Sequence, residues 1–239
     1  MESFNKTQNA LHFEQLNQKY VSLCEKYKGS FEKLNEEVSA KAYRYEYSVG
    51  GLSLHRGFYS PSSLDLTVKG LSRGRLLKKQ PKSGKFDYEY AFDDQNRLIC
   101  VKCMGYKSSA KIEFLLYENN RVLSLVYDFG SGFNRLTLIS ECQYNNDKLI
   151  RYESALCIPS ETKYKCVEIN VEETNYENGL MKSVLWSSFS PIMKLLSQIF
   201  YVFERDESGC LATYTSEELT NPNSIYRGLV SVEVLKRRK

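Results

Sequence analysis

Apolar residues in the first forty positions follow a helical period. They are separated by three or four positions, which places them on one side of a helix: Phe13, Leu16, Tyr20, Leu23 and Tyr27, then Phe31, Leu34 and Val38. Gly29 interrupts this run, and a glycine costs about 1 kcal/mol relative to alanine in a helix, so we expect a bend or break there. The pattern predicts an N-terminal helical segment over 1–40, packed on the rest of the chain. A short intermolecular coiled coil is the alternative.

Beyond residue 40 the period changes to two. Apolar and polar residues alternate in short runs, which is typical of antiparallel strands with one buried face. The expected hairpins pair 86–92 with 98–104, 112–116 with 123–129, 136–144 with 150–156, 167–171 with 180–186, and 199–203 with 211–215. An early strand at 43–47 precedes them and one at 230–234 follows. We therefore predict an α+β fold, mainly antiparallel β, with a curled hairpin meander over 41–239.

Three details of this prediction are specific enough to test. Four aromatic residues should share one face of the first hairpin strand: Phe86, Tyr88, Tyr90 and Phe92. The less regular stretch 60–85 should hold a short strand at 64–68 and otherwise form an exposed loop. Ser190 and Pro191 form a typical helix start, so a short helix is expected over 192–198. The pattern leaves open whether the sheet closes into a barrel.

The turns between the predicted strands repeat, each placing Asn, Asp or Gly between an aromatic strand and an apolar return strand. The first reads Phe92-Asp-Asp-Gln-Asn-Arg-Leu98 and resembles the YD-repeat turn Tyr-Asp-x-x-Gly-Arg-Leu of Rhs-type bacterial proteins. Asp206, Gly209 and Leu211 match half of that pattern. The resemblance implies aromatic β-hairpins. The chain is also similar to hairpin-meander immunity proteins of bacterial polymorphic toxin systems, which implies a protein partner such as a toxin domain.

Composition narrows the protein class. The chain has 239 residues, 42% hydrophobic and 26% charged, which excludes global disorder and allows a core without disulfides. Its formal net charge of +4 is too mild for general affinity to polyanions. No apolar run is long enough for a membrane span and no signal peptide is evident. Seven cysteines, an odd number, favour reduced thiols, so we expect a cytoplasmic protein that does not associate with membranes.

One local stretch departs from the average charge. Six cations without an acid lie within 73–85: Arg73, Arg75, Lys78, Lys79, Lys82 and Lys85. The first four are our candidate binding residues. The stretch carries no interleaved aromatic rings, so base stacking is not indicated. A solvated loop is the alternative interpretation, and 236–239 forms a second basic group.

Residues that could support catalysis or metal binding are few. Cys100 and Cys103 form a CxxC, but residues three apart on a strand point to opposite faces. His12 and His55 are the only imidazoles, and no nucleotide, metal or nucleophile motif surrounds them. Adjacent carboxylates occur as Asp93–Asp94, Glu172–Glu173 and Glu217–Glu218. We therefore predict no catalytic residue, no metal and no cofactor.

The sequence favours a non-enzymatic, protein-binding protein that acts by covering a partner's surface, with a toxin-immunity protein as its most specific form. Tyrosine-rich sheets provide large, rigid contact areas, which suits an interface. A nucleic-acid or anionic-ligand binder that uses 73–85 is the first alternative. A hydrolase with an acidic cleft is the second, since two carboxylates could converge across the fold. The oligomeric state stays open.

Overall fold

The computed structural model describes residues 6–51, 55–81, 86–104, 110–129, 134–220 and 230–234. It begins with two helices, α1 (Lys6–Tyr27) and α2 (Phe31–Lys41), which are separated at Gly29 as the pattern predicts. A short 3-10 helix, η1 (Gly57–Tyr59), and α3 (Ser63–Thr67) follow the first strand. No helix among the described residues is long and apolar enough to cross a membrane.

All described strands belong to a single antiparallel sheet. Its members are β1 (Arg44–Val49), β2 (Arg75–Leu76), β3 (Tyr88–Phe92), β4 (Leu98–Cys103), β5 (Lys111–Glu118), β6 (Arg121–Asp128), β7 (Arg135–Asn145), β8 (Lys148–Ile158), β9 (Lys165–Glu177), β10 (Leu180–Ser190), β11 (Leu195–Arg205), β12 (Leu211–Glu218) and β13 (Val230–Val234). From β3 to β13 each strand pairs with the next one along the chain, while β1 lies beside β3 and β2 forms the edge. The predicted α+β class and hairpin meander are confirmed.

Tight turns explain this regular connectivity. Asn119, Asn146, Asp147 and Asn178 all have positive φ angles in the turns of three hairpins. Asn and Asp adopt this left-handed conformation more readily than other non-glycine residues, and two-residue hairpin turns need it. The turn chemistry seen in the sequence therefore sets the strand order directly.

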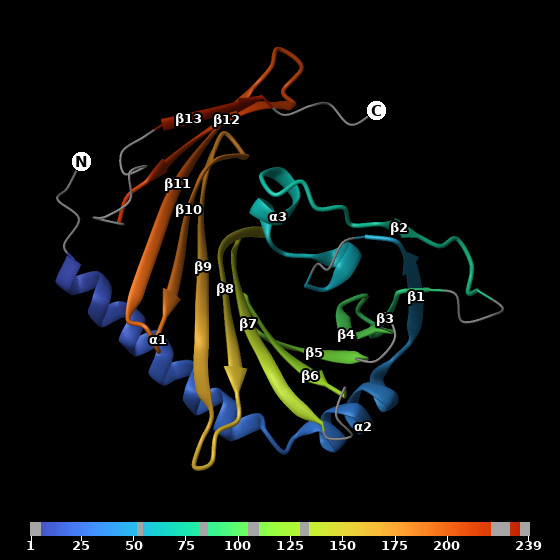
Figure 1. Ribbon diagram of the computed structural model, residues 1–239. Coiled ribbons are helices and arrows are strands. Elements are labelled where there is room, and N and C mark those ends of the chain that lie inside the picture. Colours follow the sequence, from blue (N-terminus) through green and yellow to red (C-terminus); the bar gives the residue numbers. More distant parts are fainter. Residues whose placement is uncertain are drawn as a thin grey trace.

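The sheet is strongly curled, and each of its faces is covered by a different segment (Figure 1). The helices α1 and α2 run along the outer side, while η1 and α3 lie inside the curve. The strand order runs from β13 to β2 without closing, so the described sheet is open rather than a barrel.

Helix α1 packs on the sheet of its own chain. Phe13, Leu16 and Tyr20 are buried against apolar side chains that include Ile139 and Ile169. Leu23 is partly buried in the same cluster. The apolar stripe in the sequence therefore faces the outer side of the sheet within one chain.

The inner face holds the aromatic residues of β3. Tyr88, Tyr90 and Phe92 share one cluster with Phe58 and Tyr59 of the covering segment. Phe86, the fourth aromatic residue of the prediction, does not belong to this cluster. Phe86 precedes β3, and its ring contacts Tyr47 with centroids 4.8 Å apart.

The predicted strand at 64–68 is wrong, because this stretch forms α3. Ser62 caps the helix, and its side chain accepts a hydrogen bond from the backbone N–H of Asp65 at 3.1 Å. Leu64 is buried among residues of β10, β11 and β12, while Val68 packs partly buried beside it. A capped turn therefore buries the same apolar residues that suggested a strand.

The predicted helix at 192–198 is also wrong. The chain turns over 191–194, with Lys194 at φ +53°, and β11 begins at Leu195. Residues from Leu195 to Gln198 pair with Ser190 to Ser187 of β10. Pairing with a neighbouring strand outweighs the local preference for a helix start, since most short isolated helices are marginal in water.

Candidate functional site

The four candidate cations lie together at an edge of the sheet. Arg75 is in β2, and Arg73, Lys78 and Lys79 flank it; all four are exposed. Lys82, Lys85 and residues 236–239 lie outside the described residues. What looked in the sequence like a loop is in this part an edge strand held by β1 through Ser48↔Leu76 and Val49↔Arg75.

Two glycines bring this edge strand close to β1. Gly74 has φ +75°, and a Cβ atom there would come within 2.4 Å of the carbonyl oxygen of Gly50. Only glycine allows the two backbones to approach in this way. The close approach of Gly50 and Gly74 therefore determines where the cations lie.

These cations are not neutralised by the described part of the chain. None of the four has an ion pair with a described residue, whereas Lys69, Arg97 and Lys102 are each paired with a carboxylate. Two nearby acids have other cations as partners, since Glu46 pairs with Arg44 and Glu89 lies 3.0 Å from the ammonium of Lys102. A third, Asp87, accepts a hydrogen bond from the backbone N–H of Gly50 at 2.6 Å. The edge therefore presents free positive charge.

A hollow of about 830 Å³ adjoins the cationic edge. Tyr45, Tyr47, Lys78 and Lys79 contribute to its walls, and Tyr45 is 47% exposed. The paired register of β2 covers β1 only at Ser48 and Val49, with one further hydrogen bond from the N–H of Leu77 to the carbonyl of Tyr47. Nearer its start, the edge of β1 that faces away from β3 is not paired with any strand in the described structure. The hollow thus combines lysines, an exposed ring and an open sheet edge.

His55 belongs to a buried polar cluster on the inner face. Its Nε2 lies 3.0 Å from Glu113 Oε1 and 3.4 Å from Ser124 Oγ, and its Nδ1 lies 3.1 Å from the Tyr152 hydroxyl. Arg56 Nε donates to the same Glu113 oxygen at 2.8 Å. Burial alone raises the pKa of Glu113, but the neighbouring His55 and Arg56 outweigh it and lower the pKa to about 2.

This cluster contains a serine, a histidine and a glutamate, but it lacks the geometry of a catalytic triad. In a triad the carboxylate holds one imidazole nitrogen and the serine uses the other. Here Ser124 donates its hydroxyl proton to Glu113, and both residues lie at Nε2 of His55. Ser124 is also fully buried. The cluster therefore holds the segment 55–59 on the sheet and does not activate Ser124 as a nucleophile.

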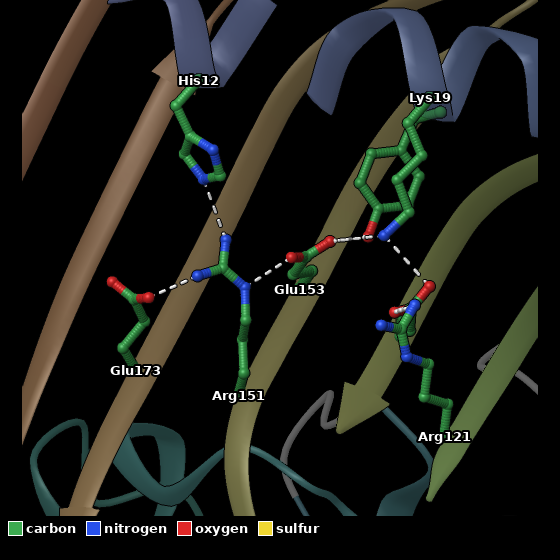
Figure 2. Close-up of polar contacts among 8 residues, drawn as sticks. His12, Lys19, Arg121, Arg151, Glu153 and Glu173 are labelled. Carbon is green, nitrogen blue, oxygen red and sulfur yellow. Dashed lines mark hydrogen bonds and ion pairs between the residues drawn. The ribbon is translucent and has the colours of Figure 1, made fainter. Parts of the chain in front are cut away.

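His12 lies in a second network, between α1 and the outer face of the sheet (Figure 2). Glu153 Oε2 accepts hydrogen bonds from the Tyr20 hydroxyl at 2.7 Å and from Lys19 Nζ at 2.9 Å. Arg151 Nε donates to the other oxygen of Glu153 at 2.6 Å, and its Nη2 donates to His12 Nε2 at 3.0 Å.

The network balances its charges. Glu141 and Glu153 are cross-strand neighbours, and Lys19 lies within 3.0 Å of both carboxylates. Arg151 also pairs with Glu173, and Arg121 lies 3.4 Å from Glu141. Burial raises the pKa of Glu153, but Lys19 and Arg151 lower it to about 2. Because every carboxylate has a cation, this network is suited to holding α1 rather than to proton transfer.

Two of the carboxylate pairs named in the sequence do not converge on a cleft. Asp93 closes its turn by accepting from Arg97, and these contacts lower its pKa despite burial. Glu172 accepts from Ser62 at 2.5 Å inside the curve, whereas Glu173 pairs with Arg151 on the outer face. Adjacent strand residues thus diverge, as the alternation predicts. Among the described residues, no three His, Cys, Asp or Glu side chains are grouped to hold a metal.

The two cysteines of the CxxC also diverge, since Cys100 joins the outer cluster and Cys103 the inner one. No motif in the sequence marks the closer cysteine pair. Cys157 and Cys166 are opposite each other on β8 and β9, buried, with sulfur atoms 3.6 Å apart. Their contact depends on strand register, which the alternation alone does not specify.

Comparison with known proteins identifies no relative, since no family model, curated protein or solved structure matches the chain.

Sequence reasoning missed both polar networks. One signal was present: Ile139 and Glu141 share a face of β7, so the alternation itself places a carboxylate beneath α1. No comparable signal marks Arg56, which comes from a segment without periodicity.

Proposed function

We propose that this protein is a non-enzymatic binding protein that covers an acidic surface of a protein partner with its cationic edge, Arg73–Lys79. A cytoplasmic toxin-immunity protein is the specific form of this proposal. The proposed partner presents carboxylates and, next to them, an extended segment that can lie along the open edge of the sheet.

The observation that carries the proposal is the free charge at the edge. Four exposed cations without an ion pair in the described structure lie within seven residues and are held by strand pairing. Such a patch accelerates association with an oppositely charged surface and disfavours like-charged partners. Two acids beside it, Glu46 and Glu89, are already paired with other cations.

The open edge favours a protein over a nucleic acid. The unpaired edge of β1 near Tyr45 offers main-chain groups that an extended peptide can pair with, as in β-strand addition. One observation favours the nucleic-acid alternative: Tyr45 lies beside Lys78 and Lys79, and exposed rings near cations can stack bases. A single exposed ring is a small platform for successive bases, so we retain this alternative as an outcome of the test.

The test compares two variants of equal net charge. One reverses Arg73, Arg75, Lys78 and Lys79 to Glu; the control reverses four exposed lysines elsewhere, Lys26, Lys163, Lys165 and Lys182. The partner is first isolated as the product of a neighbouring coding sequence that forms a stoichiometric complex. At low salt we expect the edge variant to associate at least about tenfold more slowly, with weaker salt dependence, and the control to change much less.

Three results would contradict the proposal. The first is equal association rates for the wild-type protein and the edge variant at low salt. The second is binding of a single-stranded oligonucleotide that the edge variant alone loses, which would support the nucleic-acid alternative. The third is hydrolysis of a substrate that is lost when a carboxylate pair is neutralised. Circular dichroism checks that both variants remain folded.

A further inference from the structure

A second hollow opens on the inner face, away from the cationic edge. Its volume is about 590 Å³, within the range of small-molecule sites. Three tyrosines, Tyr59, Tyr117 and Tyr144, contribute to its walls together with Val122 and two leucines. Arg56 contributes the one cation among its lining residues, and Asp147 the one carboxylate.

Arg56 is an unusual residue to find in this position. Only 5% of its surface is exposed, and it lies in the turn before η1 with φ +61°. Its pairing with Glu113 does not by itself explain it, since a buried ion pair is often no more stabilising than apolar residues of equal volume.

The guanidinium group retains donors for a ligand. Nε donates to Glu113 at 2.8 Å and Nη2 to Ser140 at 3.5 Å, which is a long contact. Arginine has five N–H donors, so three have no oxygen acceptor among the described residues. The thiol of Cys142 is a further neighbour, and sulfur accepts only weakly.

The tyrosine, valine and leucine walls suit an apolar body, and the lining is completed by Asn119, Asn120 and Asn146. The Tyr117 hydroxyl donates to the carbonyl of Leu98 at 2.8 Å, which fixes its ring. Burial raises the pKa values of Tyr117 and Tyr144, so both phenols stay uncharged at neutral pH. We propose that this cavity binds a small organic carboxylate, whose charged group pairs with Arg56 and whose apolar body lies among the three tyrosines.

Asp147 provides a sharp control because it lies at an exposed turn beside the cavity. Its charge opposes an anionic ligand but not a neutral one. Asp147→Asn removes that charge, and asparagine tolerates the φ of +61° at this position. A Val122→Phe variant fills the cavity without changing charge, and the double variant Arg56→Met/Glu113→Gln removes the buried charges together, so that neither is left unpaired.

The experiment titrates the full chain with 4-phenylbutanoate and, as the matched neutral probe, 4-phenylbutan-1-ol, using calorimetry and NMR at pH 7 and low salt. We expect the acid to bind more tightly than the alcohol. Asp147→Asn should tighten binding of the acid about two- to fivefold and leave the alcohol unchanged. Val122→Phe should weaken both probes at least about tenfold, and the double variant should bind the acid no better than the alcohol.

Equal affinity for acid and alcohol would overturn the proposal, as would an acid that does not saturate the protein below about 10 mM. Unchanged affinity of the Asp147→Asn variant for the acid would also overturn the proposal. This comparison remains informative even if a variant with a core substitution does not fold. The edge variant with four reversed cations should bind the acid as the wild-type protein does. This site and the proposed protein-binding edge therefore succeed or fail separately.

Discussion

Among the described carboxylates, Glu172 is the one whose surroundings least favour its charge. It lies on β9 and is buried beside the N-terminus of α3, where Ser62 donates a hydrogen bond to it. Burial, together with the nearby Asp65, nevertheless raises the pKa of Glu172 to about 7. The folded state therefore binds a proton more tightly than the unfolded chain. The stabilisation is present below about pH 4.5 and is lost as the pH rises through 7, a difference of roughly 3 kcal/mol.

Glu172→Gln removes this charge but keeps an oxygen that can accept from Ser62. We expect the variant to be more stable than the wild-type protein at pH 8 and about equally stable at pH 4. Urea unfolding at several pH values measures this difference. Glu177→Gln, at the exposed end of the same strand, controls for the loss of one carboxylate. A wild-type-like pH profile for Glu172→Gln would contradict the argument.

Gly74 is a single residue on which the cationic edge depends. Alanine at this position meets the Gly50 carbonyl at 2.4 Å and must also adopt φ +75°. We expect Gly74→Ala to detach β2 from β1 and to weaken partner binding, with little effect on the rest of the sheet. Hydrogen exchange should show faster exchange at Leu77, whose N–H bonds to Tyr47. Gly209→Ala, also at positive φ but in open space, is the matched control.

At the scale of the element, α1 is attached to the sheet by apolar contacts and by one ionic network. Phe13 packs on Phe189 with ring centroids 5.3 Å apart, and Glu153 joins Lys19, Tyr20 and Arg151. Helices of globular proteins gain most of their stability from such packing. The network adds a fixed register, because Glu153 can satisfy its donors in only one position of the helix.

Glu153→Gln should lower the free energy of unfolding by about 1–3 kcal/mol at pH 7, since Lys19 and Arg151 lose their shared anion. The pKa of Glu153 is lowered to about 2, so its contribution is present above about pH 4.5 and is lost as the pH falls to 2. The variant and the wild-type protein should therefore converge near pH 2 in denaturant titrations. Glu36→Gln, at an exposed position of α2, is the control. An equal difference at both pH values would be inconsistent with an ionic role.

For the whole molecule, the helices are one of two covers over a single large sheet. Beneath α1 lie fully buried residues such as Tyr127, Ile139 and Ile169. Deleting residues 1–38 should expose this face, so we expect loss of cooperative unfolding and strong binding of a hydrophobic dye. A deletion variant with wild-type stability that no longer dimerises would instead support the intermolecular coiled coil.

Much of the fold was predictable because it depends on local patterns. The period-two alternation placed the strands from β3 to β12, and Asn and Asp at the turns connected each strand to its neighbour. The two failures at 64–68 and 192–198 have a common cause. In both, a short apolar segment has no preference strong enough to resist its surroundings: α3 is capped by Ser62, and Leu195 pairs with β10.

The candidate sites also combine features that the sequence determines with features that depend on the tertiary structure. The sequence by itself determined the cationic stretch, because charge density can be read from consecutive residues such as Arg73 and Arg75. It also determined that the CxxC thiols diverge, because the strand period is two. Only the tertiary structure decided that these cations lie on an open edge, that Glu153 meets α1, and that Arg56 meets Glu113 across 57 positions of the chain. The physical reason is that strand register and the curl of the sheet bring distant residues together, and no local pattern carries that information.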